Sequence, residues 1–254
     1  MFLERLRPAA AHAFLGRRAV GLSRAGQPMQ WQALPMAADP IATLLQLAVQ
    51  SQPRPRNLHL WLSGAFARPF VAGPLAGMRR WHEAQTVLAA MAPDATGLEG
   101  PCAVWTAGPV HREAAVVVAM PQALLDELSR QAKAQALRLR SVRPWWSAAF
   151  NAGLAQAPTA RLLVLDDGEA LTSLQGEGEA HNLTTSEAAT QWPAPDEQQR
   201  AGWLARLMAG RNLAPPHTCT VRIGAGHPPP WQGLADVPFG AALQAGQTTE
   251  AQAA

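Results

Sequence analysis

Short apolar segments and amphipathic segments alternate along most of this chain, and that order constrains the fold more than any single motif does. Residues 114–120 form a β-branched apolar run, residues 121–136 carry leucines on one helical face, and residues 137–142 alternate in polarity. Apolar residues with a period of two indicate strands, and a period of 3.6 indicates helices. Alternation of the two is typical of an α/β protein, so the sequence predicts mixed sheets flanked by helices.

The same reasoning predicts elements along the rest of the chain. Asp39 is a predicted N-cap with Pro40 at the first helical position, so a helix is expected to run to about Gln50. Further helices are expected at residues 78–91, 121–136, 145–155 and 195–209. Strands are expected at residues 18–23, 29–34, 58–62, 66–71, 103–107, 114–120, 137–142, 162–165, 170–174, 178–183 and 218–223. The first two strands are predicted to form a hairpin, and the strand at 66–71 to pair with the strand at 58–62.

Charge is distributed unevenly along the sequence. Residues 1–80 hold ten arginines against Glu4 and Asp39, a net charge of +8, whereas residues 81–254 hold eleven basic and sixteen acidic side chains. A basic first third favours an acidic partner or an anionic membrane surface. Because the arginines are scattered and no nucleic-acid-binding motif accompanies them, nucleic-acid binding is not expected.

The apolar runs of the sequence are too short to form a transmembrane helix. The longest run, residues 114–120, is far below the roughly 20 residues that a membrane-spanning helix needs. Residues 1–26 hold five arginines and no apolar core of the signal-peptide type, so a cytoplasmic location is expected. Cys102 and Cys219 have no CxxC partner and are expected to be reduced, buried thiols.

Three segments match the pattern of a known family. The first segment, residues 113–144, has the predicted order strand, helix, strand, with Pro121 directly after the first strand. The second segment, residues 166–172, matches the pattern DxGxxxT. The third segment has the sequence Val-Arg-Ile-Gly-Ala-Gly at 221–226 and is followed by Gln-Gly-Leu at 232–234. These segments resemble the end of the first domain, the second-domain hairpin and the adenosine loop of actin-like ATPase fold proteins. The resemblance is to the type IV pilus assembly PilM family and the cytoplasmic domain of type II secretion GspL. It implies an actin-like, ribonuclease H-like architecture of two subdomains.

The resemblance and the turn signals together divide the chain into four parts. Residues 1–17 are expected to be an N-terminal lead segment, 18–157 a first actin-like subdomain, 158–243 a second, shortened subdomain, and 244–254 a disordered tail. The boundary between the subdomains is placed at Ala157-Pro158-Thr159.

The resemblance also implies that part of the nucleotide site is lost. ATP-binding members open with a phosphate loop of the form V-G-I-D-x-G, and the corresponding residues here are Val20 to Ala25. Ser23 replaces the acidic residue that helps to hold metal-bound phosphates, and Ala25 replaces the glycine that allows phosphate to approach the backbone. We therefore expect a degenerate actin-like protein. If it binds nucleotide, the expected site residues are Ser23, Asp166, Gly168, Thr172, Gly224 and Gly226.

Each of these motifs has a structural alternative. Asp-Gly between two apolar strands is a common hairpin signal, and Gly224-Ala225-Gly226 is also an ordinary turn sequence. His217 and Cys219 would share one face of a strand, but a metal site needs three or four ligands, so no metal is expected. No GxSxG motif is present, and nucleophilic catalysis is not expected.

Trp145 and Trp146 follow Pro144 and are candidates for an exposed aromatic anchor that binds a partner. In Trp145-Trp146, one ring is expected to pack into the core and the other to cover a rim, and Trp81 is expected to bury its ring behind Arg79 and Arg80.

The leading hypothesis for function is a cytoplasmic scaffold or adaptor that binds a membrane-anchored partner of a pilus or secretion assembly without hydrolysing nucleotide. The expected partner is the tail of an inner-membrane assembly protein, and a homo-oligomer is left open. No cofactor is expected, with ATP and Mg²⁺ as the alternative. Two other hypotheses remain: an ATP-dependent ATPase or kinase that uses Asp166, and an orphan α/β binding module.

Overall fold

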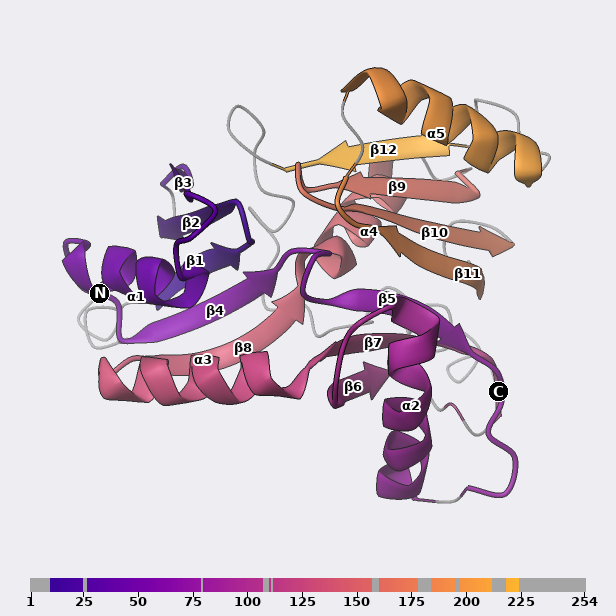
Figure 1. Ribbon diagram of the computed structural model, residues 1–254, viewed down its shortest axis with the longest axis horizontal. Coiled ribbons are helices and arrows are strands. Elements are labelled where there is room, and N and C mark those ends of the chain that lie inside the picture. Colours follow the sequence, from indigo (N-terminus) through magenta and orange to yellow (C-terminus); the bar gives the residue numbers. More distant parts are fainter. Residues whose placement is uncertain are drawn as a thin grey trace, which may run out of the picture.

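A five-stranded mixed sheet forms the first part of the fold (Figure 1). The structure, a computed structural model, describes residues 10–24, 27–78, 80–106, 110, 112–156, 160–177, 184–194, 197–211 and 218–223. The sheet has the order β3 (Gln30–Ala33), β2 (Ala19–Arg24), β1 (Ala10–Leu15), β4 (Asn57–Leu62) and β8 (Arg138–Pro144). Strands β1, β4 and β8 run parallel, and β2 and β3 are antiparallel to their neighbours.

Two helices cover one face of this sheet. Helix α1 (Pro40–Gln50) packs against β1 and β2, and α3 (Gln122–Ala134) packs against β8 and touches α1. The α1 prediction is confirmed at both ends. Asp39 Oδ1 accepts hydrogen bonds from the amides of Ile41 (2.9 Å) and Ala42 (3.2 Å), and Pro40 opens the helix. The buried face of α1 carries Ile41, Leu44, Leu45 and Ala48, the residues at helical spacing.

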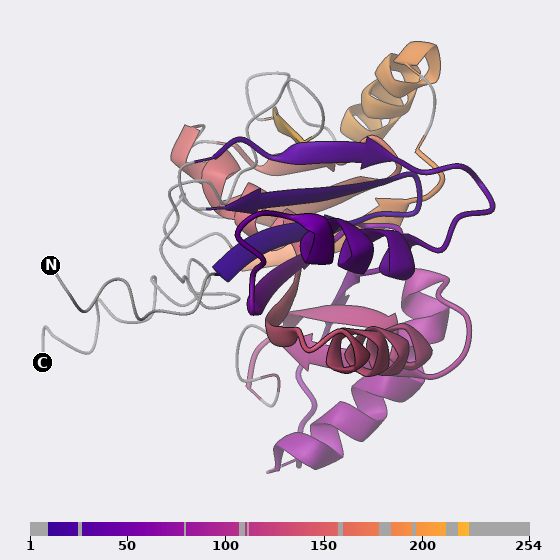
Figure 2. The same ribbon diagram turned by 90° about the vertical axis from the view of Figure 1, so that its left-hand side faces the viewer.

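An antiparallel three-stranded sheet forms a lobe with its own core. Its order is β5 (Arg68–Ala72), β7 (Ala115–Pro121) and β6 (Cys102–Thr106), and α2 (Trp81–Thr96) covers it. Figure 2 shows this lobe, with α2, below α1. Its core holds Phe70, Leu88, Val104 and Val117. The prediction that residues 66–71 pair with 58–62 is wrong, because β5 pairs with β7, whose valines provide an apolar strand partner.

The second half of the chain builds a four-stranded sheet. Its order is β11 (Thr184–Gln191), β10 (Leu171–Glu177), β9 (Leu162–Asp166) and β12 (Thr218–Arg222), with β9 and β12 parallel. Helix α4 (Trp145–Gln156) packs on one face of the sheet, and α5 (Glu197–Gly210) lies on the other (Figure 1). The predicted strand at 178–183, the predicted boundary at 157–159 and the predicted tail at 244–254 lie outside the described residues.

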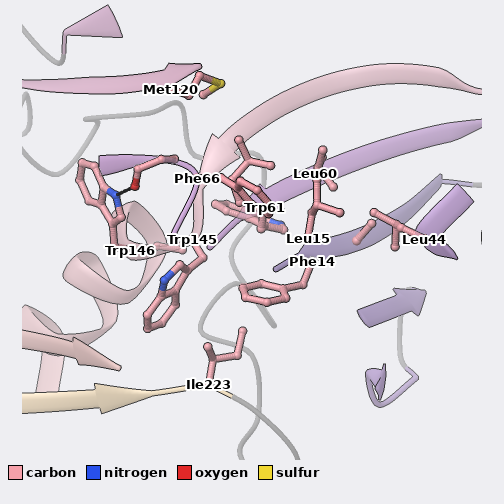
Figure 3. Packing of buried hydrophobic residues seen from close by; sticks show 14 of the residues in the cluster. Phe14, Leu15, Leu44, Leu60, Trp61, Phe66, Met120, Trp145, Trp146 and Ile223 are labelled. Atoms are coloured by element: carbon pink, nitrogen blue, oxygen red, sulfur yellow. Dashed lines mark hydrogen bonds between the residues drawn. The ribbon is translucent and has the colours of Figure 1, made fainter. Parts of the chain in front are cut away.

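One apolar core joins the two halves of the chain. Phe14 from β1, Trp145 from α4, Leu163 from β9 and Ile223 after β12 belong to the same cluster of buried residues (Figure 3). Trp145 is fully buried and Trp146 is 2% exposed, with its indole N–H donating to the carbonyl of Ala67 at 2.9 Å. The expectation that one of these tryptophans covers a rim is therefore wrong: both rings pack inside.

Several other local predictions need correction. Strand β1 was expected to be part of a lead segment, but it lies between β2 and β4 in the five-stranded sheet. Helix α2 begins and ends later than the predicted 78–91, and Trp81 at its start is 46% exposed rather than buried.

Cys102 is buried and Cys219 is half-buried, and both are free thiols. Among the described residues, no helix is long and apolar enough to cross a membrane.

Candidate functional site

Two hairpin turns from opposite halves of the chain are in contact with each other. The first turn, Gly16 to Arg18, joins β1 to β2, and the second, residues 167–170, joins β9 to β10. The carboxylate of Glu169 in the second turn accepts hydrogen bonds from the backbone of the first. The amide of Arg17 donates to Oε1 at 2.9 Å and to Oε2 at 2.7 Å, and the amide of Arg18 donates to Oε2 at 2.8 Å.

This contact matches the geometry of an anion site. Successive backbone N–H groups in a tight turn form a concave donor surface that binds phosphate and carboxylate groups. Here the bound anion is the side chain of Glu169, which is 3% exposed. A Cβ added to Gly16 would lie 2.6 Å from Glu169 Oε1 and 2.9 Å from the carbonyl oxygen of Ala19. Gly16 is therefore required by the close approach of the two turns.

Asp167 fixes the shape of the second turn. Its Oδ1 accepts from the amides of Glu169 (3.1 Å) and Ala170 (2.7 Å), and its Oδ2 accepts from the amide of Gly64 (2.8 Å). Burial and the negative charge of Glu169 raise the pKa of Asp167 from its ordinary 3.8 to about 7, against the opposing effect of these hydrogen bonds. The hydrogen bond from Gly64 thereby joins the loop after β4 to the contact between the two turns.

Asp166 and Gly168 have structural partners within the second half. Asp166 Oδ2 lies 2.7 Å from Arg200 Nη1 and 3.4 Å from Arg222 Nε, and its Oδ1 accepts from the amide of Gly168 at 2.9 Å. Gly168 has a φ of 83°, which favours glycine and supports the hairpin interpretation of Asp-Gly. The carboxylate that the alternative ATPase or kinase hypothesis relies on is thus paired with two arginines.

The guanidinium of Arg17, in the first turn, lies over two aromatic rings. It lies 5.2 Å from the ring centroid of Phe66 and 4.7 Å from that of Trp192. The guanidinium of Arg68 lies 5.6 Å from the centroid of the same Trp192 ring. Burial and the charge of Arg17 lower the pKa of Arg68. These contacts connect the first turn, the three-stranded lobe and the end of β11.

The structure does not bring Ser23 and Asp166 together. Residues 19–24 form strand β2 and not a phosphate loop, and Ser23 pairs with His12 of β1. The Ala19 end of β2 lies next to the hydrogen bond between the Arg18 amide and Glu169. Ser23 is four positions further along the strand, about 13 Å away. Assignment of the first loop to Val20–Ala25 is corrected: the turn lies at Gly16 to Arg18.

The remaining predicted residues fall into two groups. Thr172 is fully buried beside Gly64, and its hydroxyl lies 3.2 Å from that of Thr190. Gly224 and Gly226 lie outside the described residues, as do His217 and Ala25. Nucleotide binding by these residues stays a prediction.

Metal and nucleophile chemistry find no support among the residues that the structure describes. No group of three or more His, Cys, Asp or Glu side chains is placed there to hold a metal ion. Burial raises the pKa of the Cys102 and Cys219 thiols, the opposite of what activates a nucleophilic cysteine.

Sequence reasoning missed Glu169, Asp167 and the Gly16–Arg18 turn. One local signal was available: Gly-Arg-Arg between two apolar segments has the composition of a hairpin turn. The pairing of that turn with Glu169 carries no local signal, because the partners lie about 150 residues apart.

Comparison with known proteins shows the fold. No family model matches the chain, and no curated protein matches it. A protein of Bacteroides thetaiotaomicron with an actin-like ATPase fold and unknown function is similar to this chain with a TM-score of 0.57 and 8% identity, over 84% of this chain and 81% of that one. The chain therefore has an actin-like fold of the ATPase type, as the sequence predicted.

Two further solved structures are also similar to this chain. The PilM–PilN type IV pilus biogenesis complex matches with a TM-score of 0.50 and 16% identity, over 82% of this chain and 67% of that one. The cytoplasmic domain of EpsL, an inner-membrane component of the type II secretion system of Vibrio cholerae, matches with a TM-score of 0.48 and 14% identity, over 96% and 95% of the two chains.

Proposed function

We propose that this chain is an adaptor of a pilus or secretion-type assembly, which binds a membrane-anchored partner and does not hydrolyse nucleotide. The observation that carries the proposal is the occupation of the anion-binding turn by Glu169. The donors of Arg17 and Arg18 already hold a carboxylate supplied by the opposite half of the chain. A phosphate group at this turn would have to displace a buried, triply hydrogen-bonded side chain.

The surroundings of Asp166 support the same proposal. A catalytic carboxylate that positions Mg²⁺ needs free lone pairs directed at the metal. Asp166 instead forms ion pairs with Arg200 and Arg222 and accepts a backbone hydrogen bond from Gly168. The Gly16–Arg18 turn contains no acidic residue, so the first half of the chain supplies no carboxylate there that would hold Mg²⁺ together with Asp166.

The assembly role rests on fold likeness and charge. The actin-like fold is shared with PilM, whose solved complex with PilN belongs to type IV pilus biogenesis, and we carry a related assembly role to this chain as part of the proposal. The net charge of +8 in residues 1–80 would favour a position near anionic lipid, where the tail of a membrane-anchored partner emerges.

Calorimetry separates the adaptor from the ATP-dependent enzyme. Mg²⁺-ATP is titrated into the wild-type chain and into Asp166→Ala, at high concentrations of protein and nucleotide. We expect no binding heat from either protein. Heat from the wild type that is lost in Asp166→Ala would overturn the proposal and favour an ATPase or kinase that uses Asp166.

A second measurement addresses the partner. Synthetic cytoplasmic tails of the inner-membrane proteins encoded beside this gene are titrated against the labelled chain by fluorescence anisotropy. We expect saturable binding of one tail, unchanged by Mg²⁺-ATP. Absence of binding by every tail would contradict the adaptor role.

A further inference from the structure

Helix α5 leaves a groove between itself and the second sheet. None of the α5 side chains whose exposure is described is fully buried, and Trp203 and Leu204 are half-buried. By contrast, Trp145 and Trp146 of α4, on the opposite face of the sheet, are within the core. Strand residues point to alternate faces, so Leu163 and Leu165 face the core with α4, whereas Val164 lies on the α5 side. The groove has a volume of about 320 Å³.

The groove has apolar walls and one charged end. Val164 and Leu171 line it from the sheet, and Trp203 and Leu204 line it from α5. At the charged end, Arg200 and Arg222 flank Asp166, so two guanidinium groups face one carboxylate. The side chain of Arg222 is 46% exposed, and its contact with Asp166 runs through Nε at 3.4 Å. Its outer face is therefore accessible to a second anionic group.

This combination specifies the chemistry of an occupant. Apolar walls favour large apolar side chains, because their burial removes apolar surface from water. An excess of positive charge at one end favours a carboxylate, for which the planar guanidinium is a well-matched donor. The groove is partly open to solvent, so it does not enclose a ligand as a closed cavity does. A peptide segment fits this shape, with some side chains inserted and its backbone outside.

We propose that the groove under α5 binds a peptide segment of a partner protein, in which an acidic side chain lies next to one or two large apolar side chains. The identity of that partner as a membrane-anchored tail rests on the proposed function, whereas the groove and its chemistry do not. The acidic side chain would lie against Arg222, and the apolar side chains would contact Leu204 and Trp203.

The test uses two probes and the full-length chain. The first probe is 8-anilinonaphthalene-1-sulfonate, an anionic group on an apolar body, whose fluorescence rises in an apolar site. The second is the peptide acetyl-Gly-Ser-Asp-Leu-Leu-Asp-Ser-Gly-amide, with a matched control in which both aspartates are lysines. Variants are Leu204→Glu, which places a charge in the wall, and Arg222→Gln, which removes the exposed guanidinium. Arg206→Gln, an exposed residue of the same helix, is the control.

The proposal predicts a specific pattern. Arg222→Gln weakens binding of both anionic probes by about tenfold, the loss expected for one charge-assisted hydrogen bond. Leu204→Glu abolishes binding, and Arg206→Gln leaves it unchanged. The acidic peptide displaces the dye, and the lysine peptide does not. Equal binding by Leu204→Glu and the wild type, or displacement by both peptides or by neither, would overturn the proposal. Circular dichroism of each variant confirms that it is folded.

The groove and the adaptor role can fail separately. If no membrane-protein tail binds but the dye and the acidic peptide follow the predicted pattern, the groove stands and the adaptor role fails. If a tail binds with unchanged affinity to Leu204→Glu, the adaptor role stands and the groove fails.

Discussion

Glu169 joins the two halves of the chain through contacts with the backbone rather than with another side chain. Its carboxylate accepts from two consecutive amides of a turn that lies about 150 residues away. Such contacts do not depend on which side chains occupy the turn, but they do require room for the carboxylate. The single residue that provides this room is Gly16.

Replacement of Gly16 by alanine tests this requirement. The added Cβ would lie 2.6 Å from Glu169 Oε1 and must displace the carboxylate or the turn. We expect Gly16→Ala to lower the free energy of unfolding by about 1–3 kcal/mol, the usual cost of overpacking a buried site. Urea denaturation measures the change. Gly73→Ala is the matched control, because a Cβ there meets no atom within 4 Å and should cost less than 1 kcal/mol.

Asp167 makes stability depend on pH. Its pKa is about 7 in the folded chain and near 3.8 when unfolded, so the folded state holds the proton more tightly between these values. The contribution is therefore fully present below pH 4 and is lost as the pH rises to about 7. We expect the wild type to lose on the order of 4 kcal/mol across this window relative to Asp167→Asn, which cannot ionise.

Urea denaturation of both proteins at several pH values measures that difference, and other titrating groups cancel between them. Asp167→Asn should be less stable at low pH, because its carboxamide has one acceptor oxygen, so either the Gly64 N–H or the N–H groups of Glu169 and Ala170 would face an NH2 group. Parallel pH profiles for the two proteins would show that Asp167 does not titrate in this range.

At the scale of elements, local signals predicted α1 well. The cap, the proline at the first helical position and the apolar spacing all lie within 11 residues of sequence and agree with one another. We expect Asp39→Ala to destabilise the chain by about 1 kcal/mol, because two amides of the first turn lose their acceptor. Thermal denaturation checks this, and Asp39→Asn, which retains an acceptor, should cost less than half as much.

Pairing between elements was predicted less well, because it depends on contacts that are distant in sequence. Strand β1 has the sequence Ala-Ala-His-Ala-Phe-Leu, whose alanines and histidine give little alternation to mark a strand. Its neighbours in the sheet, β2 and β4, decide its structure, and β4 lies more than 40 residues further along the chain. Likewise, β5 follows β4 in sequence but pairs with the valine-rich β7.

The candidate site divides in the same way. The Asp-Gly hairpin at Asp166 to Gly168 was visible in the sequence because a turn is local. The partners of that hairpin were not visible: Arg200, Arg222 and the Arg17 amide come from three other segments. A sequence motif can therefore mark a turn while leaving open whether the turn holds a phosphate or another part of the chain.

At the scale of the whole molecule, the shared core predicts cooperative unfolding. Phe14 from the first half packs in one cluster with Trp145, Leu163 and Ile223 from the second, and Glu169 adds a polar link. Neither half can separate without exposing this apolar surface to water. We expect one thermal transition for the wild type, with coincident midpoints by far-ultraviolet circular dichroism and by tryptophan fluorescence.

Glu169→Ala tests how much the polar link adds to the shared core. Two partly buried amides, those of Arg17 and Arg18, lose their acceptor, which costs about 2 kcal/mol and lowers the melting temperature by about 4–8 °C. Because the apolar cluster is unchanged, we expect the variant still to unfold in one transition. Two separated transitions in Glu169→Ala would mean that this carboxylate, and not the core, holds the halves together. A melting temperature equal to that of the wild type would mean that the Glu169 contact adds nothing to the fold.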